Sequence, residues 1–307
     1  MGTEKQYAPI ALFVYCRPDH VKRNIEALLR NSEAKETDLF IFSDGPKNEK
    51  AKEGVKQTRS YIRTIDGFKS VTICEREINW GLAKSLINGI SQIVEKYGRI
   101  IVLEDDILVS PYFLKYMNDG LDLYQYEEKV ASIHAYTYPH KNTLPDTFFI
   151  KGADCWGWAT WKRAWRIFNP NATELYNEIK RRNLQREFDF DYTFPYFNML
   201  KAQIEGKVSS WAVCWYASAF LADMYTLYPN LPMAKQIGMD GIGATHSVVT
   251  DNYDVELNMR NLELSFIPIE NSIKGVEMFK SFFLKIKSLK GKIWRLLKIL
   301  ILDKLGF

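Results

Sequence analysis

One stretch constrains the fold of this chain more than any other, because an apolar run, Ile100 to Leu103, ends abruptly in Glu104, Asp105 and Asp106. An apolar run this short, bounded by charge, predicts a strand buried on both faces of a mainly parallel sheet. Ligands of open α/β sheets bind beyond the carboxyl ends of the strands. Three adjacent carboxylates repel one another unless a cation lies among them, and Mg²⁺ is usually held by one or two carboxylates plus substrate phosphates. The stretch therefore predicts a metal–diphosphate site, with a solvated acidic turn as the alternative.

Two further apolar runs are expected to bring polar residues to the same edge of the sheet. Residues 9–16 predict a buried strand followed by Arg17, and residues 38–43 predict another followed by Asp44. The helical spacing of apolar residues in 79–97 predicts a helix before the strand at 100–103. Strands that alternate with helices predict a parallel, doubly wound α/β fold. An arginine can pair with a diphosphate, and an aspartate can accept from a uracil or ribose donor. Because neither Gly-x-Gly-x-x-Gly nor a P-loop follows the first strand, the pattern indicates a nucleotide-diphosphate-sugar site.

Composition and charge narrow the class of protein. With 47% hydrophobic and 25% charged residues, the 307-residue chain is typical of a globular protein able to bury a sizeable core. We expect no signal peptide, myristoylation signal or transmembrane helix. The four cysteines are widely spaced, which favours free thiols in a reducing cytosol. From Asn271 onward the net charge is +7, which leaves −3 for the preceding residues and argues against a nucleic-acid partner.

The basic charge is concentrated in residues 271–307, where apolar residues recur at steps of three and four. The lysines and arginines alternate with Phe279, Phe282, Ile286, Leu289, Ile293, Leu296 and Leu300. This spacing predicts an amphipathic helix of the kind that lies in a membrane interface. The alternative is a helix docked on the body of the protein or on a partner subunit.

Eight short motifs follow one another in a fairly specific order, at residues 15–18, 42–45, 79–84, 102–106, 155–161, 188–191, 210–216 and 238–246. In this order the chain resembles the GT-A glycosyltransferases, specifically the bacterial family-2-like sugar transferases related to eukaryotic N-acetylglucosaminyltransferase I. The resemblance covers about residues 8–250. It implies a GT-A fold, a nucleotide-sugar donor such as a UDP-sugar, an Mn²⁺ or Mg²⁺ ion, and inversion at the anomeric carbon.

The resemblance also implies roles for individual residues. The donor site would comprise Arg17, Asp44, Asn79, Lys84, Glu104 and Asp105, with Arg17 and Asp44 on the uridine. Asp106 would bind the metal ion directly. His246 would contact the diphosphate or complete the metal shell, with an ordinary loop histidine as the alternative.

Inversion needs a base that takes the proton of the acceptor hydroxyl. The acid pair after the aromatic segment matches the region where the relatives place that base, with Asp191 as first choice and Asp189 as second. The alternative is that one of them caps the helix expected near Pro195. Trp156 or Trp158 would form the sugar-binding wall of the donor or acceptor site, because sugar C–H faces stack on indole. Core packing is the alternative for each.

These inferences predict an inverting, metal-dependent hexosyl- or N-acetylhexosaminyltransferase. Residues 1–250 would form the catalytic domain, with a donor half at about 8–110 and an acceptor half at about 111–250. Residues 251–270 would be a linker and 271–307 a membrane-association tail. The enzyme would lie on the inner face of the bacterial plasma membrane and act on a lipid-linked or membrane-bound glycan in surface polysaccharide biosynthesis.

Two other functions remain open at the level of sequence. A sugar nucleotidyltransferase also pairs acids and metal on an α/β sheet, but it would need a Gly-rich basic loop after the first strand. A non-catalytic, membrane-tethered glycan-binding protein would bind sugar without turning over a donor.

Overall fold

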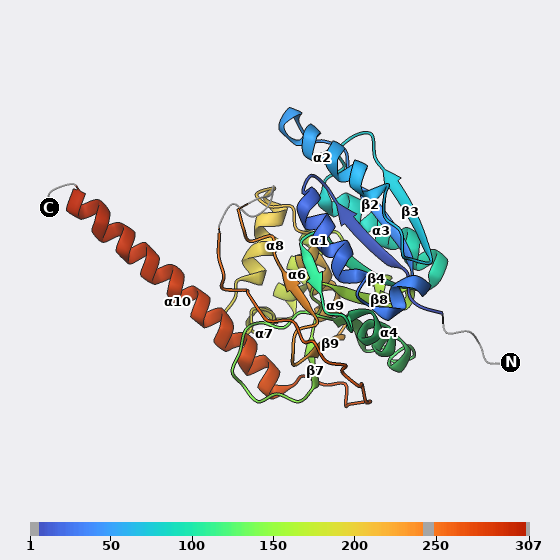
Figure 1. Cartoon of the computed structure of the whole chain (residues 1–307). Helices are drawn as coiled ribbons and strands as arrows, with labels where there is room; N and C mark the ends of the chain where they lie inside the picture. Colours follow the sequence, from blue (N-terminus) through green and yellow to red (C-terminus); the bar gives the residue numbers. More distant parts are fainter. Residues whose placement is uncertain (1–5, 242–248, 305–307) are drawn as a thin grey trace.

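The computed structural model describes residues 6–241 and 249–304, with side chains up to residue 288, and shows an α/β fold built on one large sheet (Figure 1). The eight-stranded sheet has the order β3-β2-β1-β4-β8-β6-β9-β7. Its strands are β1 (Ile10–Val14), β2 (Asp38–Ser43), β3 (Ser70–Glu75), β4 (Arg99–Glu104), β6 (Val130–His134), β7 (Thr147–Lys151), β8 (Trp158–Trp161) and β9 (Tyr225–Pro229). A separate antiparallel pair consists of β5 (Ile107–Val109) and β10 (Ala234–Gln236).

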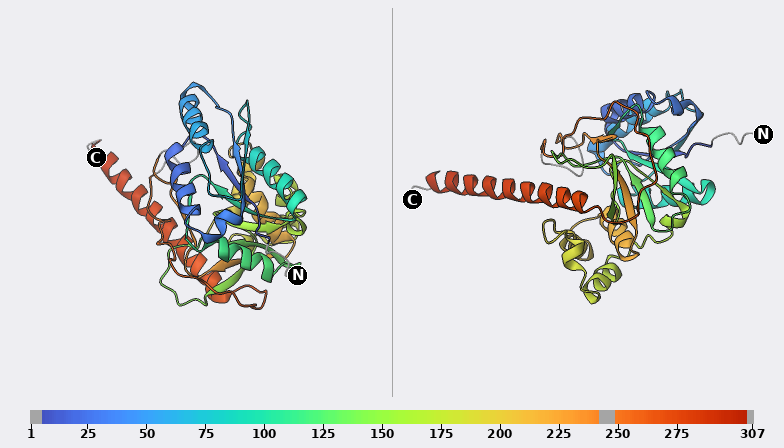
Figure 2. Two further views of the ribbon diagram at one scale, coloured as in Figure 1. Left: turned by 45° about the vertical axis from the view of Figure 1, so that its right-hand side comes forward. Right: turned by 90° about the horizontal axis from the view of Figure 1, so that it is seen from below.

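Helices flank the sheet, and Figure 2 shows α1 and α3 on opposite sides of it. The helices are α1 (Pro18–Leu28), α2 (Glu49–Ile62), α3 (Leu82–Tyr97), α4 (Phe113–Leu123), α5 (Lys162–Trp165), α6 (Ala172–Arg181), α7 (Gln185–Phe188), α8 (Tyr196–Ile204), α9 (Trp211–Leu221) and α10 (Ile273–Lys304), with a 3₁₀ turn at Ser32–Glu36. The predicted fold class, α/β with a mainly parallel central sheet and a C-terminal helix, is confirmed. The strands β3, β2, β1 and β4 are parallel to one another, whereas β4–β8, β6–β8 and β7–β9 are antiparallel.

The register of the parallel strands positions the site. All five residues of β1 are buried because helices cover both faces of the strand. On its two sides β1 pairs Val14 with Ser43 of β2, and Phe13 with Glu104 of β4. The polar residues that follow these three strands therefore meet at one edge of the sheet, as the sequence predicts.

Two hydrophobic cores fill the molecule. The first lies between the parallel strands and helices α1, α3 and α4. The second is rich in aromatic side chains and joins β7 and α6, α8 and α9 to the beginning of α10. Within it, Phe188 stacks on Tyr216 with ring centroids 4.6 Å apart. The second core thus includes part of the chain that the sequence places in a separate tail.

Residues 251–270, expected to be a linker, pack along the body of the protein. The carbonyl of Asn258 accepts a hydrogen bond from Ser110 Oγ at 2.6 Å, and the backbone N–H of Ile267 donates to Tyr124 Oη at 3.1 Å. Apolar side chains of the segment, Ile267 among them, cover the first core. The segment therefore packs on the body of the protein and does not form a free linker.

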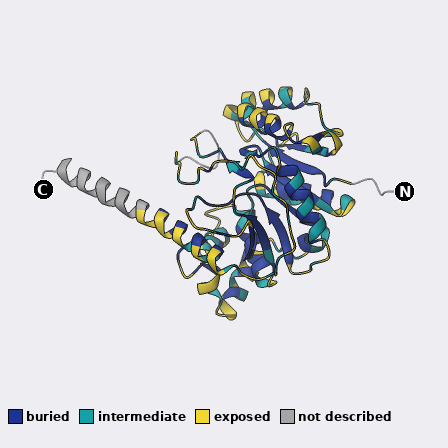
Figure 3. Cartoon of the chain, turned by 60° about the horizontal axis from the view of Figure 1, so that its bottom comes forward, coloured by how far each residue is buried: buried dark blue, intermediate teal, exposed yellow. Residues whose placement is uncertain are grey.

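Helix α10 begins inside the second core and then projects away from the body (Figure 1). Figure 3 shows buried residues at its first turns and exposed ones farther along. The side chains buried there are Met278, Phe279, Phe282, Phe283 and Ile286. Three residues of the apolar face expected to contact a membrane, Phe279, Phe282 and Ile286, are therefore docked on the protein, which is the alternative that the sequence left open. Within the described part of the chain, every helix is either too short or too polar to cross a membrane.

Candidate functional site

A cleft of about 460 Å³ opens beyond the carboxyl ends of β1, β2 and β4. The residues that line it include Arg17, Asp44, Asn79, the acids 104–106 and Trp156. Gln236, at the end of β10, closes the cleft beside the acids. The structure therefore brings together most of the residues that the sequence assigned to a nucleotide-sugar site.

An arginine provides the positive charge among the acids. The Arg17 guanidinium donates to Asp105 and, at 2.9 Å, to Asp106 Oδ2. Burial raises the pKa of Asp105 to about 6; Arg17 opposes this increase and Asp106 adds to it. Burial, reinforced by the charges of Asp106 and Asp105, raises the pKa of Glu104 to about 8. The raised pKa values of Glu104 and Asp105 reflect burial and mutual repulsion among the acids, which a further cation would relieve.

The second sheet fixes the position of Asp106. Gln236 Nε2 donates to Asp106 Oδ2 at 3.2 Å, and the N–H of Ile237 donates to the Asp106 carbonyl at 2.8 Å. A Cβ atom on Gly238 would lie 2.3 Å from Asp106 Oδ2 and 2.9 Å from Arg17 Nη1, so only glycine fits here. Sequence reasoning missed Gln236, and the one signal for this contact was the glycine-rich stretch that begins at Gly238.

The acid cluster fits a divalent ion that is shared with a substrate. In the described residues, no group of three or more His, Cys, Asp or Glu side chains is arranged to hold a metal ion by itself. Asp105 Oδ2 is buried without a hydrogen-bond partner, so the cluster has an unsatisfied oxygen beside Asp106. One carboxylate plus the oxygens of a diphosphate is the usual environment of Mg²⁺. The predicted ligand His246 lies outside the described residues.

Asp44 holds a turn at the rim of the cleft. Its Oδ1 accepts from the N–H groups of Gly45 and Trp80, and its Oδ2 accepts from Asn79 Nδ2 and the N–H of Gly81, at 2.8 to 3.0 Å. These four donors occupy the acceptor positions of the carboxylate. Asp44 therefore fixes the 79–81 turn beside the cleft, and contact with a uracil remains a prediction.

Lys84 lies at the edge of this region without lining the cleft. Its ammonium is 4.4 Å from the centroid of the Trp80 ring, and the guanidinium of Arg76 is 3.5 Å from the same centroid. The two cations stack on one indole at the start of α3. Sequence reasoning missed Arg76, which no motif marked.

The two candidate tryptophans have different environments. Trp156 is partly exposed and lines the cleft, where its ring meets Tyr136 and Tyr253 edge-on at 4.8 and 5.5 Å. Trp158 is fully buried in the core and packs against Trp215 at 5.6 Å. The prediction that Trp158 contacts a sugar is wrong, because β8 turns this side chain into the protein and only Trp156, in the preceding loop, reaches the cleft.

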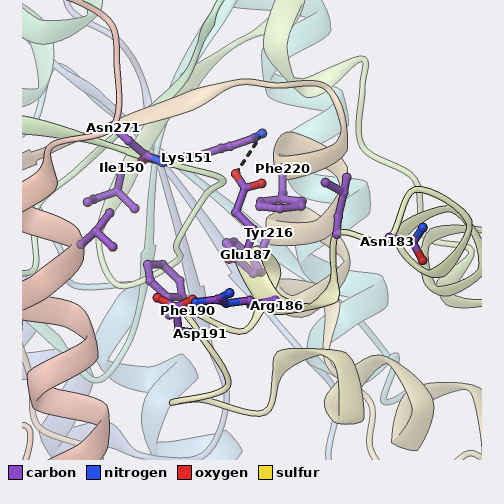
Figure 4. Close-up of a pocket in the computed structure, with 12 residues that line it drawn as sticks. Ile150, Lys151, Asn183, Arg186, Glu187, Phe190, Asp191, Tyr216, Phe220 and Asn271 are labelled. Carbon is purple, nitrogen blue, oxygen red and sulfur yellow. Dashed lines mark hydrogen bonds and ion pairs between the residues drawn. The ribbon is translucent and has the colours of Figure 1, made fainter.

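The acids predicted to supply the base lie outside the cleft. Asp189 is buried, and its Oδ1 accepts from the N–H of Phe197 at 2.8 Å, so it caps α8 as the sequence alternative stated. Asp191 is exposed and pairs with Arg186 at 2.7 Å and with Lys280 of α10. It lines a different cavity, of about 300 Å³, shown in Figure 4. Residues 190–192 all adopt positive φ, so the acid pair lies in a turn and not in an extended strand.

Comparison with known proteins supports the family indicated by these features. The sequence model of the GNT-I family matches residues 1–174, more than half of the chain, and the chain belongs to that family. A curated relative, the alpha-1,3-mannosyl-glycoprotein 2-beta-N-acetylglucosaminyltransferase of Arabidopsis thaliana, is 22% identical over 202 residues. The match covers 61% of this chain and 46% of the relative, so the chain spans about half the length of that protein.

The chain shows partial likeness to solved structures of S. aureus TarS and of a mannosyltransferase. TarS 1–349 in complex with UDP-GlcNAc is 13% identical, with a TM-score of 0.31 over 45% of this chain and 37% of that one. A mannosyltransferase from Pyrobaculum calidifontis in complex with GDP-Man and Mn²⁺ is 9% identical, with a TM-score of 0.29 over 45% and 40%. A further TarS structure is 12% identical, with a TM-score of 0.37 over 73% and 37%.

Proposed function

We propose that this protein is a glycosyltransferase that moves a hexosyl or N-acetylhexosaminyl group from a nucleotide-sugar, in the first instance a UDP-sugar, to a glycan acceptor. The observation that carries the proposal is the cleft at the ends of β1, β2 and β4, where Arg17 faces the acids 104–106. Membership of the GNT-I family agrees with it. A sugar nucleotidyltransferase is disfavoured because Cys16, Arg17 and Pro18 stand where its Gly-rich loop would lie.

The residues of the cleft have separable roles in this reaction. Arg17 would rotate from Asp105 and Asp106 to the diphosphate, where its planar guanidinium can make two parallel hydrogen bonds. Gln236 would keep Asp106 oriented. Asn79 and the turn held by Asp44 would contact the nucleoside, and Glu104 and Asp105 would contact the ribose and neighbouring groups.

A divalent ion, Mn²⁺ or Mg²⁺, would be held by Asp106 together with the donor diphosphate. When bound it would neutralise the charge that develops on the leaving diphosphate. We further propose that the reaction inverts the anomeric carbon, so that one acid of the protein must accept the proton of the acceptor hydroxyl.

Calorimetric titration with UDP tests the donor site. We expect the wild type to bind UDP in the presence of Mn²⁺ and to bind at least about 10-fold more weakly without it, since 1.4 kcal/mol corresponds to tenfold in affinity. Asp106→Asn should lose the Mn²⁺ dependence, whereas Asp66→Asn, which removes an exposed carboxylate between α2 and β3 that is not among the residues lining the cleft, should not. Equal UDP affinity with and without Mn²⁺ would refute the metal role, and no binding of UDP or other nucleotide would refute the transferase proposal.

We also propose that α10 attaches the enzyme to the inner face of a bacterial plasma membrane, where it would act on a lipid-linked or membrane-bound glycan in surface polysaccharide biosynthesis. Support comes from the projection of α10 away from the body and from the basic charge of the sequence beyond residue 270. Basic residues near an anionic surface contribute about 1 kcal/mol each. No nucleic-acid partner is proposed.

Removal of residues 289–307 tests this attachment without opening the second core. The full chain should sediment with vesicles containing anionic lipid and stay in solution with vesicles of phosphatidylcholine alone. The shortened chain should stay in solution with both and should still bind UDP. Undiminished sedimentation of the shortened chain would exclude the membrane role of the tail.

A further inference from the structure

Helix α2 carries an arginine that contacts the backbone of residues next to the cleft. Arg59 is not among the residues that line the cleft, and its side chain is 18% exposed. Its ion pair with Glu75 is long, at 3.7 Å. Charge pairing alone therefore does not account for the position of this guanidinium, and no motif of the sequence marked it.

The Arg59 guanidinium ties the ends of two neighbouring strands together. Nε donates to Ser43 Oγ at 3.2 Å, and Nη2 donates to the carbonyl groups of Ser43 and Asp44 at 3.4 and 3.3 Å. The same Nη2 donates to the carbonyl of Arg76 at 2.6 Å. Ser43 is the last residue of β2 and Arg76 is the first after β3, so one side chain bridges both strands. This needs several donors in a fixed planar fork, which arginine has and lysine lacks.

The residues between β3 and α3 form a loop, residues 76–81, that borders the cleft. Asn79 and Gly81 line the cleft, as does Asp44. The Asp44 carboxylate accepts hydrogen bonds from the last three residues of the loop. The loop is thus attached at its first residue by Arg59 and at its end by Asp44.

The loop also packs tightly against the residue that follows Asp44. A Cβ atom on Gly45 would lie 2.5 Å from the carbonyl carbon of Ile78 and 2.9 Å from the backbone nitrogen of Asn79. These neighbours are backbone atoms, so the loop itself would have to move. Glycine at position 45 lets the loop approach β2, and Arg59 holds it there.

A loop fixed in advance favours ligand binding, because the ligand does not have to supply the conformational entropy of ordering it. In the proposed donor site, Asn79 and the turn held by Asp44 contact the nucleoside. Without Arg59, the carbonyl groups of the buried residues Ser43 and Asp44 would lose a charged donor. The 76–81 loop would lose one of its attachments, and the nucleoside would have to order it.

We propose that Arg59 is a positioning residue of the donor site, which fixes the 76–81 loop for the nucleoside of the nucleotide-sugar; this rests on the proposed transferase function. In this role Arg59 touches neither the substrate nor the metal ion. The acids that would hold the ion have separate contacts, with Arg17 and Gln236. Loss of Arg59 should therefore weaken nucleotide binding and leave the contribution of the metal ion unchanged.

Calorimetric titration with UDP, with and without Mn²⁺, tests this assignment on the wild type, Arg59→Met and Arg59→Lys. Lysine keeps the positive charge without the planar fork. Arg63→Met is the matched control, because Arg63 lies four residues further along α2, pairs with the same Glu75 at 2.8 Å and is 60% exposed. Gly45→Ala displaces the same loop with Arg59 in place. Urea unfolding of each variant measures stability separately.

We expect Arg59→Met and Gly45→Ala to weaken UDP binding by roughly 10-fold or more, the scale of one hydrogen bond to a charged group. Arg59→Lys should also bind UDP more weakly than the wild type, and Arg63→Met should bind it equally well. In every variant, the ratio of the affinities with and without Mn²⁺ should stay within about twofold of the wild-type ratio, as for independent sites. A merely structural role would lower the urea midpoint without changing the Kd of the folded protein.

Wild-type UDP affinity in Arg59→Met or Arg59→Lys, or an equal loss in Arg63→Met, would overturn the assignment. If Arg59→Met does not fold, Arg59→Lys decides. A collapse of the Mn²⁺ dependence in the Arg59 variants would also overturn it, because Arg59 would then act on the metal side of the cleft. A wild type that binds no nucleotide refutes the donor site and the proposed function, whereas a wild type that binds UDP leaves only the role of Arg59 in question.

Discussion

Replacement of Arg17 by methionine should destabilise the protein in a way that depends on pH. Arg17 is the cation that pairs with Asp105 and Asp106, whose residues are only 3% and 6% exposed. Removing one partner of a buried pair costs about 3–5 kcal/mol, because the remaining charge is left uncompensated. Part of this cost disappears wherever the carboxyl groups can take up protons.

The pKa of Asp105 sets the pH range in which stability should change. In the wild type this pKa is about 6, against an ordinary value of 3.8, so the native state holds more protons than the unfolded state between about pH 4 and 6. Stability therefore falls as pH rises through that window. In Arg17→Met the charge that lowers the pKa of Asp105 is gone, so the fall continues above pH 6. The variant should lose about 1.4 kcal/mol more for each pH unit until its own, higher pKa is reached.

Urea unfolding at pH 5.5 and pH 8 measures this difference. The destabilisation by Arg17→Met should be larger at pH 8, and Mn²⁺ should reverse part of it by supplying a cation to the same acids. Arg63→Met is the matched control, because Arg63 forms an exposed pair with Glu75 worth under about 1 kcal/mol. A cost below about 1 kcal/mol at pH 8, or an equal cost at both pH values, would refute the reasoning.

Three further changes test other parts of the structure. Phe282→Ala should destabilise by about 3–5 kcal/mol in urea unfolding because the ring is buried, whereas Leu284→Ala on the exposed side of α10 should change stability by less than about 0.5 kcal/mol. Burial raises the pKa of Asp189 to about 6, so wild-type stability should fall between about pH 4 and 6, and Asp189→Asn should flatten this dependence in a pH series of unfolding curves. Gly238→Ala would force Asp106 aside and should weaken UDP–Mn²⁺ binding by roughly 10-fold or more in calorimetry, since overpacking costs about 1–3 kcal/mol.

The parallel part of the sheet could be predicted from the sequence because its signals are local. Short apolar runs that end in Arg17, Asp44 and the acids 104–106 define parallel strands, and parallel strands bring their ends together whatever the rest of the chain does. What the sequence could not supply is the pairing within the site. Side-chain geometry across separate strands determines that Arg17 pairs with the acids. It also determines that the Asp44 carboxylate accepts hydrogen bonds from the 79–81 turn.

The acceptor half was harder to predict because its signals depend on backbone turns. Trp156 and Trp158 are two residues apart, yet one lies in a loop at the cleft and the other in a buried strand. Alternation along a strand would have placed both on the same face, but Trp156 precedes the strand and Gly157, between the two, adopts a positive φ that an extended strand does not have. A backbone turn also explains the position of Asp191. Its own positive φ is part of the turn in which its carboxylate pairs with Lys280, outside the cleft.

The contacts of α10 change how the C-terminal helix should be understood. Phe282 stacks on Tyr138 at 4.5 Å and meets Tyr253 at 5.5 Å, and Tyr253 in turn meets Trp156 at 5.5 Å. A continuous line of aromatic contacts thus connects the base of α10 to Trp156 in the lining of the cleft. A deletion that begins at Phe279 would remove part of the second core and the support of Tyr253 along with any membrane contact. Loss of transfer in such a protein would therefore say nothing about membranes, whereas deletion from residue 289 leaves this line intact and separates the two effects.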